Sequence, residues 1–533
     1  MSETTLDNEP APSRSLNEVH RGLLIVLAVA IGYACLHAGF RLLASNVLGE
    51  DDVTDIILSQ DLRAGYDAVA RQPPLYNWVL WGLEQLMGPS LETFLVIKYA
   101  ALVASAGFLY LSARRAIGDP LFALLTVESL ALIYSIAWRY HEGFTHETGA
   151  MVAVLATTWL LLRIIQDGGN LNFVWLGITM GLGFLTEPAY IVFLVSMLAA
   201  ACLQSGLRTK LLEPRLGAAI IAAVLIASPY WSWLLEEPRR MAWLTGLWSD
   251  GWSFNWDGSW DAFRGPFAYL APLIFILPVI FPGWLKTALA DLKRNPLAEP
   301  EPNYEIFILH AGLIALFASI FGALVFEISG LAVHVLMPLY LATVIWLFGV
   351  ARRSGYEEHN IKWFGRIAIA IALVAFFARM ANLYIMDPVC KKCRWGIPYT
   401  VLAQEMRDRG FVETGTIVSL ERELSGNLRA LFPDAKLVAR RHPSFTPEGA
   451  DWTRGRVAYV WDAKKMPPER AQRYLRLLLP KDIRAADAER LSIPWTHLFK
   501  PKGYRTSDWY LLIVDKGKKK RVINSSRERR LGL

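Results

Sequence analysis

Four carboxylates crowd into one short stretch of the chain, directly after its first long apolar run. They are Glu50, Asp51, Asp52 and Asp55. A carboxylate can take a proton from a hydroxyl group when it lies within hydrogen-bond reach and has a pKa suited to the working pH. Partial shielding at a membrane face raises such a pKa. We therefore predict that this stretch holds a general base and that the neighbouring acids serve other roles.

The spacing of these acids allows two interpretations. On a helix, Asp51 and Asp52 would point about 100° apart, so one could be the base while the other orients a partner. Asp55 follows Asp51 by one turn and could share its face. In the plainer interpretation, a solvated acidic cluster begins a helix over 53–63, because acids favour helix N-termini. The spacing alone leaves both interpretations open.

A second polar cluster lies in Arg139-Tyr140-His141-Glu142 and Thr145-His146-Glu147. Two histidines and two glutamates of this kind can hold a divalent metal, with His141 and His146 as candidate ligands. The histidines are not at i, i+4 spacing, which excludes the helical zinc motif. Ordinary polar residues at a membrane interface would look similar, so a metal is one of two interpretations.

Several cations on the same predicted face are candidates for holding a phosphate. A phosphate leaving group needs such partners to neutralise its charge. For each arginine the alternative is a solvated or snorkelling interfacial side chain, and for the histidine it is a polar residue between helices. The candidates are Arg63, Arg71, Arg139, Arg239, Arg240 and His334.

The composition indicates a protein that crosses a membrane several times. Hydrophobic residues make up 54% of the 533 residues, 20 residues are Trp, and the mean hydropathy is +0.30. These values argue against an ordinary soluble globule. Many basic residues behind the formal charge of +7 sit in short loops between apolar runs, which predicts membrane flanks and no nucleic-acid partner. We expect an inner-membrane protein without a cleavable signal peptide.

Apolar runs of spanning length recur through residues 22–385, which predicts a polytopic α-helical domain with about eleven spans. If the tail 1–21 is cytoplasmic, the even-numbered runs lead into basic loops, as the positive-inside rule requires. This topology puts the first loop, 44–90, and everything after Tyr384 on the outer face. The runs are 22–43, 91–113, 119–138, 147–165, 171–187, 188–206, 214–235, 265–286, 304–326, 331–350 and 363–385.

Residues 386–533 change character and predict a small α/β domain outside the membrane. Cys390 and Cys393 stand at its start, and outside the cytoplasm such a pair can close a small disulfide, which we favour over free thiols. A redox or zinc site would need further flanking elements. The basic tail 516–521 is expected to meet solvent or anionic lipid. Helices are predicted at 399–410, 427–433 and 467–479, and strands at 416–420, 436–439, 456–461 and 509–514.

Short motifs in a fixed order resemble the membrane glycosyltransferases of the GT-C superfamily. The resemblance is nearest to the branch of protein O-mannosyltransferases and of the aminoarabinose and galacturonic acid transferases that modify lipopolysaccharide. The start of the outer domain resembles the galacturonic acid branch in particular, through Cys390-Lys391-Lys392-Cys393-Arg394-Trp395 and Gly426-Asn427-Leu428-Arg429. The other motifs are the pair Asp51-Asp52, the turn 72–78 (QPPLYNW), the run 181–185 (GLGFL) and the run from His334 to Pro338.

The resemblance implies inverting transfer of a sugar from a polyprenyl-phosphate donor to an acceptor on the outer face. A lipid glycan is preferred over a protein as acceptor. Asp51 matches the expected base, Asp52 the second acid of the pair, and Glu147 an acid of the second outer loop. Membrane lipids are the remaining expected partners, and a divalent metal is a possible cofactor.

Two positions depart from the family pattern. Thr186-Glu187-Pro188 and Gln72 stand where relatives often carry a Lys suited to phosphate. Binding of the donor phosphate must therefore depend on other cations. The predicted substrate-binding residues are Glu147, Arg63, Arg71, Gln72, Arg139 and His334.

Three other functions compete with this prediction. One is a protein O-mannosyltransferase-like enzyme. Another is a transporter for a lipid-linked precursor, which is expected to show charges at mid-membrane and inverted repeats, whereas the charges here sit mostly at span ends. The last is a non-catalytic scaffold that uses the outer domain for binding.

Overall fold

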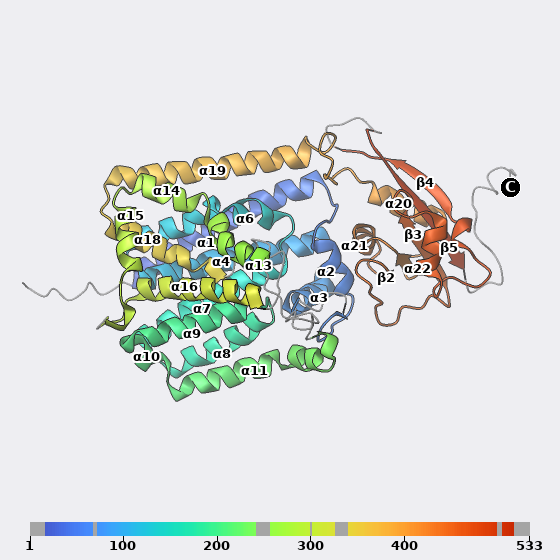
Figure 1. Ribbon diagram of the computed structural model, residues 1–533. Coiled ribbons are helices and arrows are strands. Elements are labelled where there is room, and N and C mark those ends of the chain that lie inside the picture. The colour runs from blue at the N-terminus through green and yellow to red at the C-terminus, as the bar shows by residue number, and fades with distance from the viewer. Residues whose placement is uncertain are drawn as a thin grey trace, which may run out of the picture.

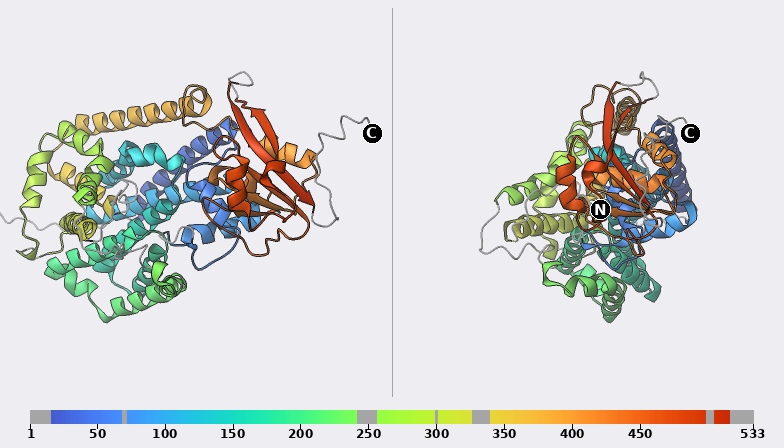
Figure 2. Two further views of the ribbon diagram at one scale, coloured as in Figure 1. Left: turned by 45° about the vertical axis from the view of Figure 1, so that its right-hand side comes forward. Right: turned by 90° about the vertical axis from the view of Figure 1, so that its right-hand side faces the viewer.

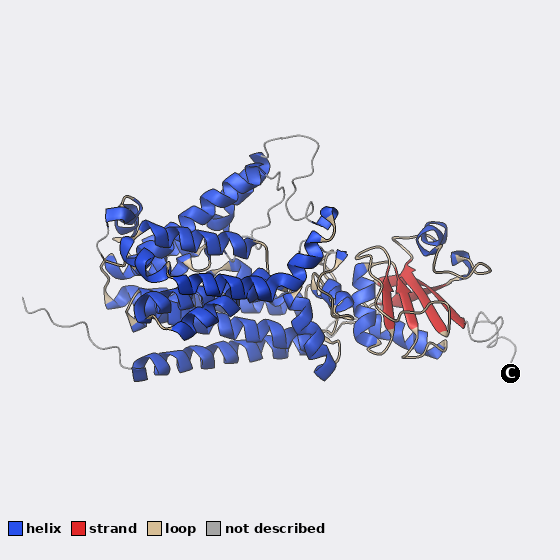
Figure 3. Cartoon of the chain, turned by 90° about the horizontal axis from the view of Figure 1, so that it is seen from below, coloured by secondary structure: helices blue, strands red, loops and turns tan. Residues whose placement is uncertain are grey.

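The protein consists of a bundle of long helices and a smaller part that contains the strands (Figures 1 and 3). The structure is a computed structural model, and it describes residues 16–67, 72–240, 256–298, 301–325, 339–497 and 504–515. The strand-containing part lies at one end of the bundle, as Figure 1 and the left view in Figure 2 show. The predicted fold class, a polytopic helical domain followed by a C-terminal α/β domain, is confirmed.

Helices of the bundle have the length and hydropathy of membrane spans. In the described residues six helices qualify, or up to 8 if each of two bent helix pairs forms one span. The pairs are 120–132 with 134–141, bent by 67°, and 256–270 with 273–280, bent by 53°. The number of about eleven spans stays a prediction. The α-helices described in the bundle, whether or not they are long enough to span a membrane, are α1 (Leu16–Ala44), α4 (Leu91–Ala116), α5 (Pro120–Glu128), α6 (Tyr134–Ala137), α7 (His146–Asp167), α8 (Asn170–Phe184), α9 (Ala189–Leu203), α10 (Ser205–Leu211), α11 (Pro214–Leu235), α13 (Trp256–Leu270), α14 (Leu273–Ile280), α15 (Trp284–Leu292), α16 (Tyr304–Val325), α18 (Thr343–Arg353) and α19 (Glu358–Tyr384).

Helix α4 shows how the sequence sets the limits of such an element. Ser90 is its N-cap, and the Ser90 Oγ accepts a hydrogen bond from the Thr93 backbone N–H at 3.4 Å. Its last turn carries Arg114 and Arg115, whose charges suit the negative end of the helix dipole. Most of its side chains are buried, so it forms the centre of the bundle and can position polar groups at its first turns.

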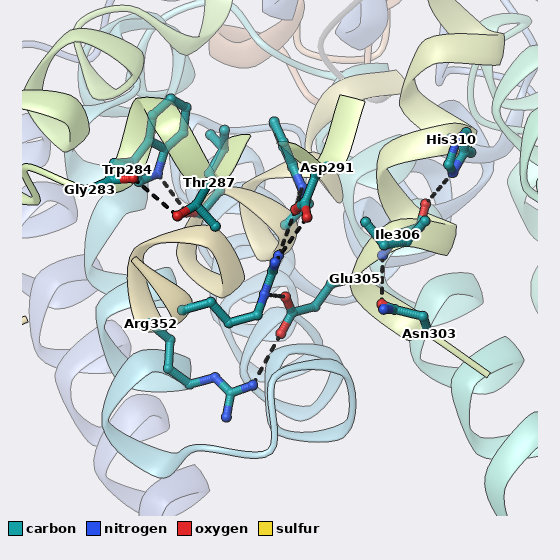
Figure 4. A network of polar contacts seen from close by, with 12 residues as sticks. Gly283, Trp284, Thr287, Asp291, Asn303, Glu305, Ile306, His310 and Arg352 are labelled. Atoms are coloured by element: carbon teal, nitrogen blue, oxygen red, sulfur yellow. Dashed lines mark hydrogen bonds and ion pairs between the residues drawn. The ribbon is translucent and has the colours of Figure 1, made fainter. Parts of the chain in front are cut away.

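Charged residues link helices at the bundle end that lies away from the strands (Figures 1 and 4). The Arg353 Nη2 lies 2.6 Å from Asp291 Oδ2 of α15, and the Arg353 Nε lies 2.7 Å from Glu305 Oε2 of α16. Arg352 reaches the same glutamate at 3.6 Å. These two arginines belong to a loop predicted to be cytoplasmic, and here they hold α15, α16 and α18 together.

The strand-containing part has one sheet of five strands in the order β2-β1-β3-β5-β4. Strand β1 is parallel to both β2 and β3, while β5 is antiparallel to β3 and β4. The strands are β1 (Thr416–Ser419), β2 (Lys436–Ala439), β3 (Arg456–Asp462), β4 (Glu489–Pro494) and β5 (Thr506–Asp515), and the helices are α20 (Tyr399–Asp408), α21 (Arg422–Leu431) and α22 (Pro468–Leu475). All the predicted elements are present. Strand β4 was not predicted, and α21 begins earlier than expected.

The junction between the two parts begins with the predicted disulfide, which joins Cys390 to Cys393. Next to it, the buried Asp387 accepts hydrogen bonds from the backbone N–H groups of Trp395, at 2.9 Å, and Gly396, at 3.3 Å. The side chain of Tyr504 also donates to Asp387. The exit from α19 is therefore fixed to the sheet domain. The basic tail 516–521 lies outside the described residues.

Candidate active site

The acidic stretch lies between the bundle and the sheet domain. It forms helix α2 (Asp52–Leu58), which is shorter than the predicted helix over 53–63. Figure 1 shows α2 beside α21 and next to α3 (Leu75–Met87). Asp52 and Asp55 are 5% and 1% exposed, so the interpretation of these acids as a solvated cluster is wrong. Buried carboxylates need specific partners.

Asp52 has such a partner in Lys98 of α4. The Lys98 Nζ donates to Asp52 Oδ1 at 2.6 Å, and both side chains are almost fully buried. Burial raises the pKa of Asp52, and the charge of Lys98 opposes that rise. An acid paired in this way is held in place and cannot readily act as a base. Asp52 therefore positions the first turn of α2.

Asp55 is held by two other helices. The Asn77 Nδ2 of α3 donates to Asp55 Oδ1 at 2.9 Å, and the His146 Nε2 at the start of α7 lies 3.3 Å from the same oxygen. The second oxygen of Asp55 is buried without a hydrogen-bond partner in the described residues. These hydrogen bonds connect α2, α3 and α7 at Asp55, one helical turn after Asp51.

Asp51 differs from its two neighbours because its side chain is partly exposed and makes no cap hydrogen bond. Burial raises the pKa of Asp51 to about 7, and the negative charges of Asp55 and Glu147 add to the rise. The Arg422 guanidinium opposes it. Asp51 is therefore accessible, and its carboxyl group changes charge near neutral pH. Both properties are required of a general base.

Glu147 and Glu187 complete an acidic cluster around Asp51. Glu147 follows His146 on α7 and accepts a hydrogen bond from the Thr145 backbone N–H at 3.2 Å. Glu187 lies in the turn between α8 and α9, where burial and the charge of Glu147 raise its pKa. We call Asp51, Asp55, Glu147 and Glu187 the acidic cluster. In the sequence, Glu187 departs from the family pattern, and nothing in its context predicts a role in the site.

The two histidines proposed as metal ligands have separate partners. Both ring nitrogens of His141 are engaged, with Tyr33 at 2.8 Å and Tyr99 at 2.9 Å, and its ring stacks on His37. His146 is bonded to Asp55 instead. Across the described residues, no group of three or more His, Cys, Asp or Glu side chains is arranged to hold a metal ion. A metal shared by His141 and His146 does not fit this geometry.

The arginines predicted to bind phosphate differ in their surroundings, and some already have partners. Arg63 donates to Asp61 at 2.7 Å and to the Thr446 carbonyl at 2.9 Å, so it serves the contact with the sheet domain, in contrast to its predicted role. Arg139 is the exposed first residue of the second polar cluster, and Gln72 is partly exposed at the turn before α3. Arg240, a further cation of this face, pairs with Asp67 at 2.7 Å. Arg71 and His334 lie outside the described residues.

Helix α21 of the sheet domain holds the acidic stretch from the other side. The Asn427 side chain accepts from the Leu48 N–H at 2.9 Å and donates to the Leu48 carbonyl at 3.1 Å. Gln60 forms the same kind of pair with the backbone of Leu437, at 2.8 and 3.0 Å. Gly426 lies so close to Val53 that an added Cβ would be 2.6 Å from the Val53 Cα. Only a glycine permits this approach of α21 to α2.

A cavity of about 630 Å³ opens at the same junction. The end of α1, the start of α4 and the sheet domain enclose it, and Asn46 and Val47 in its wall lead directly into the acidic stretch. Its wall also contains the aromatic rings of Trp395 and Tyr399 and the amide of Asn427. Aromatic faces beside hydrogen-bonding groups are features of sites that bind small polar molecules such as sugars.

Comparison with known proteins agrees with this architecture. Residues 71–233 match the model of the family described as dolichyl-phosphate-mannose-protein mannosyltransferase. The lipopolysaccharide core galacturonosyltransferase RgtB of Rhizobium johnstonii is 22% identical over 468 residues, which cover 85% of this chain and 91% of the relative. The galacturonosyltransferase RgtA of the same organism is 23% identical over 480 residues, covering 87% of this chain and 92% of the relative.

The fold has a counterpart among solved structures. ArnT from Cupriavidus metallidurans bound to undecaprenyl phosphate matches with a TM-score of 0.59 at 14% identity, covering 92% of this chain and 97% of ArnT. Its apo form matches with a TM-score of 0.55 at 13% identity, over 91% of this chain and 97% of ArnT. The resemblance to polyprenyl-phosphate-sugar glycosyltransferases and the predicted class of enzyme are confirmed.

Proposed function

We propose that this protein transfers a hexuronate, such as galacturonic acid, from a polyprenyl-phosphate donor to a hydroxyl group of a lipopolysaccharide core. Both relatives that align along most of the chain are named as lipopolysaccharide core galacturonosyltransferases. The solved structure with the same fold holds undecaprenyl phosphate, which is the lipid carrier that such a donor would release.

The observation that carries the proposal is the state of Asp51. It is the partly exposed member of a buried acidic cluster, and its pKa is raised to about 7. In the proposed reaction, Asp51 takes the proton of the acceptor hydroxyl while that oxygen attacks the anomeric carbon of the sugar. The bond between this carbon and the phosphate oxygen breaks, and polyprenyl phosphate leaves with the electron pair. Attack opposite the leaving group inverts the anomeric centre.

Other residues position the base. The Lys98–Asp52 pair and the contacts of Asp55 fix both ends of the first turn of α2, so Asp51 is held in one place. Pre-organisation of this kind lowers the entropic cost of reaching the transition state. Gln72 and Arg139 are the predicted substrate-binding residues that are exposed at least in part at this face, whereas Glu147 is buried in the acidic cluster. We propose that the acceptor sugar enters through the cavity beside Asn46.

The proposed location is the inner membrane, with the sheet domain and the acidic cluster outside the cytoplasm. The Cys390–Cys393 disulfide supports this side, because disulfides persist in oxidising compartments. The proposed units are a cytoplasmic tail over 1–21, a catalytic membrane domain over 22–385 with its first outer loop at 44–90, and an outer domain over 386–533.

Mass analysis of lipopolysaccharide from a deletion strain tests the proposal. Loss of one hexuronate from the core, restored by the native gene and not by an Asp51→Asn variant expressed at the same level, supports it. Unchanged lipopolysaccharide with altered glycans on envelope proteins would favour protein mannosylation, as the family description suggests. If neither the lipopolysaccharide nor the protein glycans change, the protein would instead be a transporter for a lipid-linked precursor or a non-catalytic scaffold.

A further inference from the structure

The proposed substrate is anionic, whereas the side chains around Asp51 are mostly acidic. Asp55, Glu147 and Glu187 surround the base, and a donor would bring a phosphate and, for a hexuronate, a carboxylate. Placing these charges together is unfavourable unless a cation compensates them. The nearby cations Lys98, Arg63 and Arg394 already pair with acids, at 2.6, 2.7 and 3.0 Å.

Arg422 of the sheet domain is differently placed. It is the first residue of α21 and lies one helical turn before Gly426, so both residues share a face. That face packs against α2, where Gly426 lies against Val53. Asp51 precedes Val53 by two residues, and the charge of Arg422 acts on Asp51, so Arg422 lies within electrostatic reach of the base. The paired hydrogen bonds between Asn427 and Leu48 fix the register of the two segments.

The guanidinium of Arg422 is also available to a ligand. Its side chain is 35% exposed, and the ion pair found for it in the described residues is with its own neighbour Glu423, at 3.5 Å. That contact is too long for a good hydrogen bond. The charge of Arg422 reaches Asp51, where it opposes the rise in the pKa of this acid. Among the described residues, Arg422 is therefore a cation within electrostatic reach of the base that has no strong ion-pair partner.

We propose that Arg422 binds an anionic group of the donor and so makes the outer domain part of the substrate site. The inference rests on the proposed function. A guanidinium can form two parallel hydrogen bonds to a carboxylate or to a phosphate, which orients the group as well as neutralising it. Bound beside Asp51, such a group would hold the sugar with its anomeric carbon next to the base. Arg422 is thus a binding and positioning residue, and Asp51 remains the catalytic one.

Two variants and one control test this role in the full-length protein in lipid nanodiscs. Arg422→Gln removes the charge and Arg422→Lys keeps it without the planar fork. Arg490→Gln is the control, because Arg490 is an exposed arginine of β4 that pairs with Asp508. Binding of undecaprenyl-phosphate galacturonic acid and of undecaprenyl phosphate alone is measured for each by ligand-induced thermal shift. This readout does not require turnover.

We expect Arg422→Gln to weaken donor binding roughly tenfold or more relative to the control, and Arg422→Lys to recover part of it. If binding of undecaprenyl phosphate alone is unchanged, Arg422 holds the sugar carboxylate. If it falls by the same factor, Arg422 holds the phosphate. Equal binding of both lipids by Arg422→Gln and Arg490→Gln would overturn the inference, provided that both variants elute as the native protein does.

Activity separates this inference from the proposed function. With the native protein active, Arg422→Gln should raise the KM for the donor far more than it lowers kcat. It should also move the pH profile of transfer to higher pH, because the pKa of Asp51 rises when the carboxylate loses a stabilising cation. A native protein that binds the donor but transfers no sugar would contradict the proposed function and leave the binding result standing.

Discussion

The Nζ of Lys98 lies 2.6 Å from Oδ1 of Asp52, and this buried pair is adjacent to the partly exposed Asp51. Two adjacent acids are thereby given different tasks. The paired acid is fixed to the centre of the bundle through α4, while its neighbour keeps a free carboxylate with a raised pKa. Their environments, and not their identical chemistry, decide which of them can accept a proton.

Loss of the base should stop transfer without loss of binding. Asp51→Asn keeps the size of the side chain and removes the proton acceptor, so we expect the transfer rate to fall roughly 100-fold or more. Single-turnover transfer from a radiolabelled donor measures the rate, and thermal shift with the donor measures binding. A variant that transfers at the native rate would exclude Asp51 as the base.

The Lys98–Asp52 pair should be a stability determinant. Lys98→Met leaves an uncompensated buried carboxylate, which costs about 3–5 kcal/mol when it stays charged. We expect a clear fall in the melting temperature in detergent. The double variant Lys98→Met/Asp52→Asn should lose less than the sum of the two single variants, because the two groups interact. Additive losses would mean that the contact contributes little.

Transfer should depend on pH in a direction set by Asp51. The base must be deprotonated, and its pKa is about 7, so the rate should rise with pH through neutrality and level off above it. Asp55→Asn removes a nearby negative charge that raises this pKa, and the profile should move to lower pH. The rate of transfer at saturating donor from pH 5 to 9 tests the shift. A shift to higher pH would contradict the placement of Asp55.

The contact between α21 and the acidic stretch should matter for activity. Asn427→Ala removes both hydrogen bonds to Leu48 and leaves a buried backbone group unsatisfied, at a cost of about 1–3 kcal/mol. We expect slower transfer with an intact outer domain. Gln404→Ala, which removes only an exposed bond within α20, is the matched control. Equal activity of the two variants would show that Asn427 does not position Asp51.

The acidic stretch could be recognised from the sequence, but its internal division of labour could not. Motif order singles out Asp51, while the sequence predicts only that Asp52 orients an unspecified partner. That partner, Lys98, is a charged residue inside the apolar run 91–113, which is itself a signal because isolated charges in spans require compensation. Arg379 in the run 363–385 gives the same signal, and it pairs with Glu142 at 3.1 Å.

The sheet domain was largely predictable because its elements have distinct periods. Strands such as β3 are continuous apolar runs, and α20 ends at Asp408, two residues before the predicted end at Gly410. Strand β4 is not predicted from the sequence, because its exposed positions carry Arg490, Ser492 and Pro494, which are not typical strand residues. The role of Arg422 could not be predicted, because it depends on the packing of α21 against a helix about 370 residues earlier in the chain (422 minus 52).

The close approach of Gly426 to Val53 has a consequence for exchanging parts between related proteins. Helix α21 packs on the sheet with one side and on α2 with the other, and Leu424, Leu428 and Val53 belong to one continuous apolar core. A chimera that received only residues 386–533 from a relative would have to match the foreign surface of α2 without a gap or a clash. Transplanting the segment 44–67 together with the outer domain would preserve the match. The residues that must be exchanged together are thus discontinuous in sequence.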